Sequence, residues 1–364
     1  MPSIEKLIRR HLTDLKPYES IDPVGVVAER AGIPAEQVIK LDANENPYGC
    51  SPRVQCALGE ADSYHIYPDP LNRELRQLLA GYTGFDPQYI AVGSGSDELI
   101  DLILRLTLEP GDRVINCPPT FGMYPFSTGV CGGEIVNVPR GPDYSVNVAA
   151  IRSAVDQRTR VIFITSPNNP TGNLTSEGDI LQLLETEVLV VVDEAYYEFA
   201  EASVAPLVPS HANLIVLRTF SKWAGLAGLR VGYAILSPQI NEVIYRMKLP
   251  YNITIAAEIA VRESLADMDY LQGKIRAILT ERERLFQELK VQGILDPIPS
   301  RGSFLLCRVV KGEALEIKQD LEKRGILVRY YDVHRLRDKL RISVGRPEHT
   351  DTLLRALSEI CPGL

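Results

Sequence analysis

Three polar segments follow one another in the middle of the chain: S-P-N-N-P-T-G at 166–172, V-V-V-D-E-A-Y-Y at 190–197 and T-F-S-K-W-A-G-L-A-G-L-R-V-G at 219–232. Each segment lies at the end of an apolar run, and these runs cover 160–165, 188–193 and 213–218. Short runs rich in Val and Ile are typical of buried parallel strands, and open α/β sheets bind ligands at the carboxyl ends of such strands. The sequence therefore predicts an α/β sheet with a ligand site along one edge.

The strand pattern extends to either side of these segments. Further runs rich in Val and Ile occupy 89–92, 113–117, 134–138 and 231–236, and helical patterns lie between several of them. Such alternation indicates crossover units and a sheet that is buried on both sides. We therefore expect a mostly parallel large sheet with helices on both faces.

The pattern changes after a long helical stretch at about 254–292. It continues with a strand at 303–309, a helix at 312–324, short strands near 326–330 and 340–344, and a helix after Pro347. This order predicts a smaller α+β domain, and a chain of 364 residues is too long for one compact core. The expected fold class is α/β, with a large domain and this second, smaller one.

Charge and composition narrow the kind of protein. The chain is 45% hydrophobic and 24% charged, and its formal charge of −8, with Lys and Arg scattered, argues against nucleic-acid binding. The first 16 residues carry both signs of charge, and no apolar run approaches the roughly 20 residues of a membrane span. We expect neither a signal peptide nor a membrane partner. Six cysteines without C-x-x-C spacing and five dispersed histidines predict reduced thiols in the cytoplasm and no metal site.

Lys222 is the strongest candidate for a reactive group. An amine that attacks a carbonyl carbon must be partly neutral, and burial near another cation favours that state. Lys222 follows the apolar run N-L-I-V-L-R-T-F and precedes a loop of small residues, a setting that suits a buried amine better than a solvated surface lysine. Asp193 ends the run V-L-V-V-V, so its carboxylate is expected at the same edge of the sheet.

A candidate anion site precedes these groups in the chain. S-G-S-D-E at 94–98 lies between a strand pattern and a helical pattern, so its backbone amides would crown a helix N-terminus and bind a phosphate. Any turn from a strand to a helix can carry such residues. The interpretation therefore depends on Ser221 and Arg230, which would complete the phosphate site.

In their order and spacing, the three segments resemble the pyridoxal-phosphate site of the fold-type I aminotransferases. The resemblance implies that Lys222 forms a Schiff base with this cofactor and also moves the substrate proton, while Asp193 holds the pyridine nitrogen protonated. It also implies that Asn169 and Tyr196 reach the phenolic oxygen, and that Phe121 in P-P-T-F-G-M-Y lies against the ring. The other cofactor ligands that it implies are Gly95, Ser96, Asp97, Ser221 and Arg230.

Over essentially its whole length the chain is similar to the histidinol-phosphate aminotransferases. The features that match are L-K-P-Y at 15–18, D-A-N-E-N-P-Y-G at 42–49 and a pair of arginines near the C-terminus, Arg329 and Arg341. The resemblance implies that Tyr18, Arg329 and Arg341 bind the phosphate ester of the substrate. It further implies that Arg341 holds the carboxylate of glutamate. Asn44, in the segment at 42–49, would line the entrance for the substrate.

The same resemblance implies an assembly and a division of the chain. Tyr67 in Y-P-D-P matches a tyrosine that reaches the cofactor phosphate of the neighbouring subunit, which implies a homodimer with shared sites. Residues 41–264 would form the large cofactor-binding domain, and 1–40 with 265–364 an N-terminal arm plus the small domain. One departure is visible, because Trp223 and Ala224 follow the lysine where relatives usually have a small residue and then an aromatic one.

The implied reaction is transamination between L-histidinol phosphate and 2-oxoglutarate, giving imidazole acetol phosphate and L-glutamate in histidine biosynthesis. An aromatic aminotransferase and the threonine-phosphate decarboxylase of corrinoid synthesis would keep the same cofactor groups, so both stay open. A non-catalytic ligand sensor of the same fold is a third alternative. Such a sensor needs a DNA-binding module, and about 40 residues with one basic patch at 9–11 leave no room for one.

Overall fold

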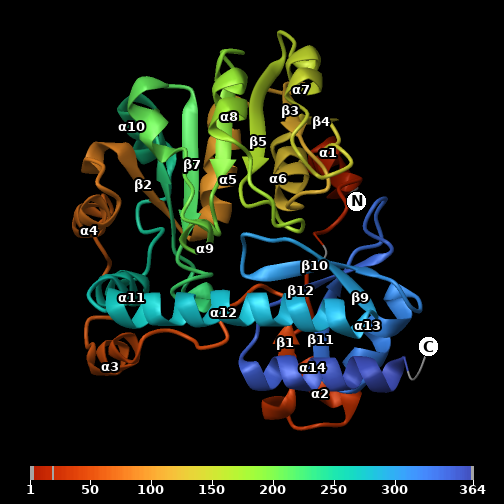
Figure 1. Ribbon diagram of the computed structural model, residues 1–364. Coiled ribbons are helices and arrows are strands. Elements are labelled where there is room, and N and C mark those ends of the chain that lie inside the picture. The colour runs from red at the N-terminus through yellow and green to blue at the C-terminus, as the bar shows by residue number, and fades with distance from the viewer. Residues whose placement is uncertain (1–3, 19, 362–364) are drawn as a thin grey trace.

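The computed structural model describes residues 4–18 and 20–361, which form two sheets with their covering helices (Figure 1). The larger sheet has seven strands in the order β2-β8-β7-β6-β5-β3-β4. β8 is antiparallel to both of its neighbours, and the other adjacent pairs are parallel. The strands are β2 (Ile90–Gly93), β3 (Arg113–Asn116), β4 (Glu134–Asn137), β5 (Thr159–Thr165), β6 (Leu189–Asp193), β7 (Leu214–Thr219) and β8 (Gly232–Ile235). The expected mostly parallel large sheet is confirmed.

Helices cover both faces of this sheet, as expected. Side chains along a strand alternate between the faces, so Val190 and Val192 of β6 join one apolar core while Val191 joins the other. The first core includes residues of α4 (Arg73–Thr83), α7 (Val148–Ala154), α8 (Glu177–Leu184) and α11 (Ile255–Leu265). The second includes residues of α5 (Gly95–Thr107), α6 (Met123–Cys131) and α10 (Pro238–Met247).

The smaller sheet has five strands in the order β1-β11-β12-β10-β9. They are β1 (Ile39–Leu41), β9 (Leu295–Ile298), β10 (Phe304–Val309), β11 (Ile326–Tyr330) and β12 (Lys339–Ser343). β1 is parallel to β11, and the other pairs are antiparallel. Residues of α13 (Ala314–Lys323) and α14 (Pro347–Ile360) pack on this sheet in a core of its own. The predicted smaller α+β region is confirmed, with β1 and β9 as unpredicted strands.

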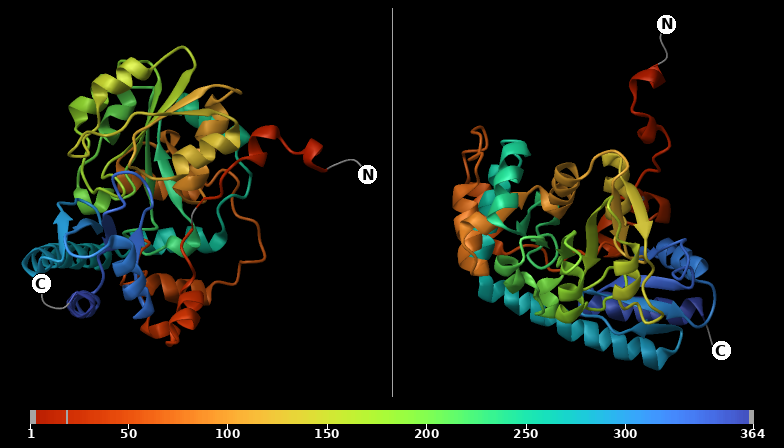
Figure 2. Two further views of the ribbon diagram at one scale, coloured as in Figure 1. Left: turned by 90° about the vertical axis from the view of Figure 1, so that its right-hand side faces the viewer. Right: turned by 90° about the horizontal axis from the view of Figure 1, so that it is seen from above.

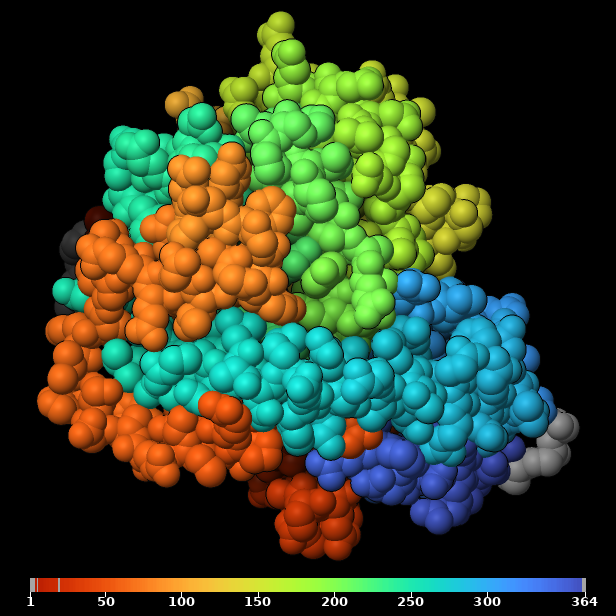
Figure 3. All heavy atoms as spheres, turned by 60° about the vertical axis from the view of Figure 1, so that its left-hand side comes forward, coloured from red at the N-terminus to blue at the C-terminus, as the bar shows by residue number. Residues whose placement is uncertain are grey.

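The predicted helical stretch at 254–292 is two helices, α11 and the 25-residue α12 (Met268–Gln292). Leu271 and Ile278 of α12 join a core of the large sheet, whereas Leu285 and Leu289 join the core of the small sheet. The helix therefore runs along both halves of the molecule (Figure 1), and it forms a band across the surface in Figure 3. The domain boundary at 264 and 265 stays a prediction.

The N-terminal segment divides between the two halves. α2 (Val24–Ala31) contacts α13, and β1 pairs with β11, so these elements lie on the small sheet as expected. The short α1 (Arg10–Thr13) instead contacts α6 of the large sheet. Residues 4–9 extend away from the body of the molecule (Figure 2), and residues 1–3 and 19 lie outside the described residues. Among the described residues, no helix has the length and apolar character needed to cross a bilayer.

Candidate active site

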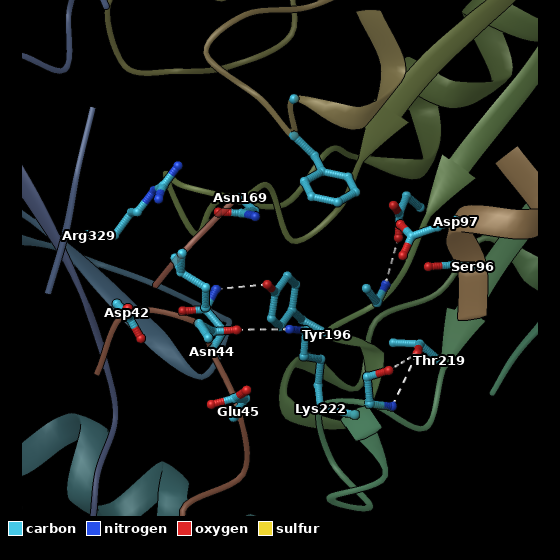
Figure 4. A pocket seen from close by; sticks show the side chains of 18 of the residues that line it. Asp42, Asn44, Glu45, Ser96, Asp97, Asn169, Tyr196, Thr219, Lys222 and Arg329 are labelled. Carbon is cyan, nitrogen blue, oxygen red and sulfur yellow. Dashed lines mark hydrogen bonds between the residues drawn. The ribbon is translucent and has the colours of Figure 1, made fainter. Parts of the chain in front are cut away.

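A pocket of about 480 Å³ lies where β5, β6 and β7 end. Residues from the N-terminal segment, the large sheet and the small sheet line it. Figure 4 shows Ser96 and Asp97 on one side of this pocket and Arg329 on the opposite side, with Tyr196 and Asn169 between them. The predicted site residues that line it are Tyr18, Asn44, Ser96, Asp97, Phe121, Asn169, Asp193, Tyr196, Ser221, Lys222, Arg230, Arg329 and Arg341.

Lys222 reaches the pocket from the loop that follows β7. Its Nζ donates a hydrogen bond to the backbone oxygen of Ala43 at 3.0 Å. Burial, with a smaller contribution from the positive charge of Arg341, lowers the pKa of Lys222 to about 8. A substantial fraction of this amine is therefore neutral near physiological pH, as a nucleophilic amine requires.

Asp193 is the last residue of β6 and is buried at the bottom of the pocket. Its Oδ2 accepts a hydrogen bond from the Tyr124 hydroxyl at 2.8 Å, and its Oδ1 accepts one from the Ala195 N–H at 3.0 Å. Burial raises the pKa of Asp193 to about 6, although both donors oppose that rise. A positively charged ring nitrogen beside this carboxylate would favour its ionised form further.

Tyr196 and Asn169 lie at the next point along the pocket. The Tyr196 hydroxyl accepts a hydrogen bond from Asn44 Nδ2 at 2.8 Å, and burial raises the pKa of this phenol to about 12. Asn169 Oδ1 accepts from Arg341 Nη1 at 2.8 Å. That contact leaves the NH₂ group of the Asn169 side chain to face a ligand oxygen.

The N-terminus of α5 forms one wall together with the loop after β7. Arg230 Nη2 donates to Asp97 Oδ2 at 2.6 Å, directly over the first turn of the helix. Gly95 supports this wall without lining the pocket. It has a φ of +79°, a backbone conformation that residues with a Cβ rarely adopt, and a Cβ there would lie 2.4 Å from Arg230 Nη2, so a side chain would strain the backbone and displace that guanidinium. Helix amides, the Ser221 hydroxyl and a guanidinium together form a cradle suited to a phosphate.

Two arginines occupy the opposite wall. Arg329 of β11 and Arg341 of β12 are paired residues of an antiparallel ladder, which places both side chains on the same face of the small sheet. The guanidinium carbons of Arg329 and Arg341 lie 5.4 Å and 5.9 Å from the ring centre of Tyr331. Arg341 Nε is buried and has no hydrogen-bond partner among the described residues. Burial raises the pKa of Tyr18 at this end, and the charge of Arg329 opposes that rise.

Tyr67 is the predicted site residue that the fold does not bring to the pocket of its own chain. It is 77% exposed and stacks on Tyr251, with ring centres 4.3 Å apart. Trp223, the unusual residue after the lysine, is fully buried and stacks on Tyr82 at 5.7 Å between ring centres. The departure in sequence is thus accommodated in the apolar core, and Lys222 still reaches the pocket.

Sequence reasoning missed several lining residues. Thr165 and Thr219 are the final residues of β5 and β7, so the strand-end argument that selected Asp193 would also have found them. Glu45 belongs to the matching segment at 42–49 but was not selected as a site residue, and Tyr331 lines the pocket from the loop after β11, where no local pattern marks it. In the described parts of the chain, no group of three or more His, Cys, Asp or Glu side chains is arranged to hold a metal ion.

The comparisons with known proteins agree with this geometry. A family model described as aminotransferase class I and II matches residues 36–357, so the chain belongs to the class I and II aminotransferases. The chain is 48% identical over 358 residues to histidinol-phosphate aminotransferase of Dehalococcoides mccartyi strain BAV1, which covers 98% of this chain and 99% of the relative. It is also 48% identical to the chloroplastic histidinol-phosphate aminotransferase 1 of Arabidopsis thaliana, over 98% of this chain and 86% of the relative.

A solved structure gives the same result for the fold. The histidinol-phosphate aminotransferase of Sinorhizobium meliloti in complex with pyridoxal-5′-phosphate superposes with a TM-score of 0.88 over 97% of each chain, at 26% sequence identity. The match in both sequence and architecture extends across both sheets.

Proposed function

We propose that the chain is a pyridoxal-phosphate enzyme that transfers the amino group of L-histidinol phosphate to 2-oxoglutarate, giving imidazole acetol phosphate and L-glutamate in histidine biosynthesis. The observation that carries the choice of substrate is the pair of arginines, Arg329 and Arg341, at the end of the pocket opposite the phosphate cradle. A phosphate ester needs such cations, whereas an aromatic side chain does not.

The residues present fit pyridoxal phosphate. The cradle that Gly95 keeps open, formed by Ser96, Asp97, Ser221 and Arg230, suits the phosphate. Asp193 would hold the ring nitrogen, Asn169 and Tyr196 the phenolic oxygen, and Phe121 one face of the ring. When bound, pyridoxal phosphate supplies an electron sink for the charge left when the substrate Cα loses its proton.

Lys222 has two roles in this proposal. Its Nζ would hold the cofactor and, when free, would accept the Cα proton as a general base. The lowered pKa of Lys222, about 8, supports both roles because each requires a neutral amine.

Arg341 and Arg329 would divide the anionic groups of the two substrates. Arg341 holds the phosphate of histidinol phosphate in one half-reaction and the carboxylate of glutamate in the other, and its unpartnered Nε offers a donor for this purpose. Arg329 and Tyr18 serve mainly the phosphate, and Asn44, which donates to the Tyr196 hydroxyl, holds that phenol in position.

The proposal includes the assembly and the location. Two copies would form a homodimer in which Tyr67 reaches the phosphate cradle of the partner subunit, and its exposed stack on Tyr251, beside the exposed Ile66 and Leu249, supports such an interface. We place the enzyme in the cytoplasm, where its six free cysteines would stay reduced.

Borohydride reduction of the cofactor-loaded protein, followed by peptide mapping, tests the central assignment. The label should appear on Lys222, and Lys222→Ala should lack both the label and turnover while keeping its fold. Label on any other lysine would contradict the proposal. Arg76→Lys provides a control for the mutagenesis, because Arg76 does not line the pocket: it donates to the Pro87 oxygen and lies over the Tyr245 ring.

A further inference from the structure

Tyr124 of α6 is a buried tyrosine that the roles proposed above leave unassigned. Its side chain is 0% exposed, and its ring stacks on Phe163 with the ring centres 4.5 Å apart. Its hydroxyl donates to Asp193 Oδ2 at 2.8 Å and lies 2.7 Å from Thr165 Oγ1. The Ala195 N–H donates to the other carboxylate oxygen, so two fixed donors set the plane of the Asp193 carboxylate.

The Tyr124 hydroxyl is the first of three linked hydroxyl groups. Thr165 Oγ1 lies 3.1 Å from Thr120 Oγ1, and Thr120 donates to Asn168 Oδ1 at 2.8 Å. The Asn168 NH₂ group donates to the backbone oxygen of Pro119 at 3.0 Å, which fixes its Oδ1 as an acceptor. The chain of contacts therefore runs from a carboxylate to an amide oxygen through groups that each carry one proton.

Counting protons shows what this arrangement favours. The three hydroxyl protons can fill three of the four contacts between Asp193 and Asn168. When Asp193 is ionised, it accepts only, so the Tyr124 proton points to the carboxylate, and the contact between Tyr124 and Thr165 is filled only when Thr165 donates to Tyr124. The charge-assisted bond from Tyr124 to Asp193 is the strongest of the four contacts, so it is the one that keeps its proton.

We propose that Tyr124 is a positioning residue for Asp193: its hydroxyl holds the carboxylate ionised and in one orientation toward the ring nitrogen of the cofactor. This inference rests on the role proposed above for Asp193. Burial is the largest influence on the pKa of Asp193, which it raises, and the charges of Asp97 and Glu194 raise it too. The Tyr124 hydroxyl and the Ala195 N–H lower it.

Among the described residues, Arg140 is another charged group close to this chain of hydroxyls. Its Nη2 donates to the backbone oxygen of Thr165 at 3.4 Å, and its charge lowers the pKa of Tyr124, the opposite of the effect of Asp193. Burial dominates and raises the pKa of Tyr124 well above the ordinary value, so Tyr124 is a proton donor at every working pH. Loss of its hydroxyl must therefore raise the pKa of Asp193.

Binding of pyridoxine 5′-phosphate to the cofactor-free protein tests the inference. This probe keeps the ring nitrogen and the phosphate but lacks the aldehyde, so it forms no bond with Lys222. In Tyr124→Phe we expect the affinity for the probe, measured by calorimetry near pH 7, to be about tenfold weaker. The acid limb of the affinity–pH profile, where binding weakens as pH falls, should lie about one pH unit higher than in wild type. Unchanged affinity and an unchanged acid limb would overturn the inference.

Thr128→Val is the matched control. Thr128 is a fully buried residue on the same helix, one turn beyond Tyr124, and its hydroxyl donates to the Tyr124 backbone oxygen at 2.8 Å without lining the pocket. This variant should bind the probe as wild type does at each pH. The same weakening and the same pH shift as in Tyr124→Phe would assign the effect to helix packing and overturn the inference.

A double-mutant cycle separates this inference from the function on which it rests. Asp193→Asn alone should weaken binding of the probe, and adding Tyr124→Phe to it should have no further effect, because the hydroxyl acts through the carboxylate. If Tyr124→Phe weakens binding by the same factor in both backgrounds, the inference fails while the role of Asp193 stands. If Asp193→Asn binds the probe as wild type does, both fail.

Discussion

Lys222 is a lysine whose amine lies in a desolvated pocket, and this has a measurable effect on stability. Its pKa is lowered to about 8 in the folded protein, against an ordinary value of 10.5. Well below pH 8 the amine is charged in both the folded and the unfolded states, and the fold bears the cost of burying that charge. As pH rises from 8 toward 10.5, the folded state releases the proton first, so the free energy of unfolding rises.

Lys222→Met should therefore stabilise the cofactor-free protein at pH 7, by about 1 to 3 kcal/mol in the free energy of unfolding. The substitution removes the buried charge and keeps an unbranched side chain of similar length. The advantage over wild type should shrink by pH 10. Urea unfolding of both proteins at the two pH values measures it. A Met variant that is less stable than wild type at pH 7 would show that the amine is well solvated in the fold.

Arg329 and Arg341 should differ in their effects on the two half-reactions. Arg341→Leu should impair the reactions of both histidinol phosphate and glutamate, since Arg341 serves both anionic groups. Arg329→Leu should reduce kcat/KM for histidinol phosphate more than for glutamate, because the proposed desolvated charge pair between Arg329 and the substrate phosphate is lost. The difference corresponds to about 2 to 4 kcal/mol in the activation free energy. Single-turnover kinetics with each substrate measure both profiles, and equal kinetics of wild type and Arg329→Leu on histidinol phosphate would favour an aromatic aminotransferase.

At the scale of elements, α12 carries a glycine in its interior. Gly273 has a helical backbone, and a Cβ added there would meet only Arg276 Nη2, at 4.0 Å. Gly273→Ala should stabilise the protein by about 0.5 to 1 kcal/mol, because alanine loses less backbone entropy in a helix. Gly172→Ala is the contrasting variant, since its Cβ would lie 2.2 Å from Ser300 Oγ at a φ of +78°, and it should destabilise. Thermal unfolding measures both, and a destabilised Gly273→Ala would contradict the prediction.

Local patterns predicted the strands of the large sheet to within one residue at each end, because apolar runs that include Val or Ile define each of them. They did not predict β1, which has three residues, or β9, which contains Pro297 and lies at the edge of its sheet. Such strands are defined by pairing with distant segments. The break between α11 and α12 also involves a tertiary contact, since Ser51 Oγ donates a hydrogen bond to the Asp267 carboxylate there.

At the scale of the whole molecule, the pocket combines residues that are far apart in the chain. Asp193 ends one strand of the large sheet and Lys222 follows the next, and the rule on strand ends was sufficient to place them together. Arg341 bonds Asn169, 172 positions away, and Asn44 bonds Tyr196, 152 positions away. No periodicity encodes such contacts, so these substrate residues were accessible from sequence only through resemblance to a family.

The proposed homodimer predicts recovery of activity in mixed subunits. An inactive Tyr67→Phe protein and an inactive Lys222→Ala protein should regain part of the activity after subunit exchange. One site of each mixed dimer would then have Lys222 from one subunit and Tyr67 from the other. If Tyr67 serves its own subunit, both sites of the mixed dimer stay defective, and activity assays after exchange would show no recovery.

The half-reaction spectrum of the cofactor-loaded enzyme tests the central claim most directly. The protein is mixed, in the absence of an acceptor, with L-histidinol phosphate, L-glutamate, L-phenylalanine or O-phospho-L-threonine, and the conversion of bound pyridoxal phosphate to the pyridoxamine form is followed by absorbance. We predict rapid, complete conversion with histidinol phosphate and with glutamate, each abolished in Lys222→Ala. Faster conversion with phenylalanine than with histidinol phosphate, or release of CO₂ from phosphothreonine, would contradict the account.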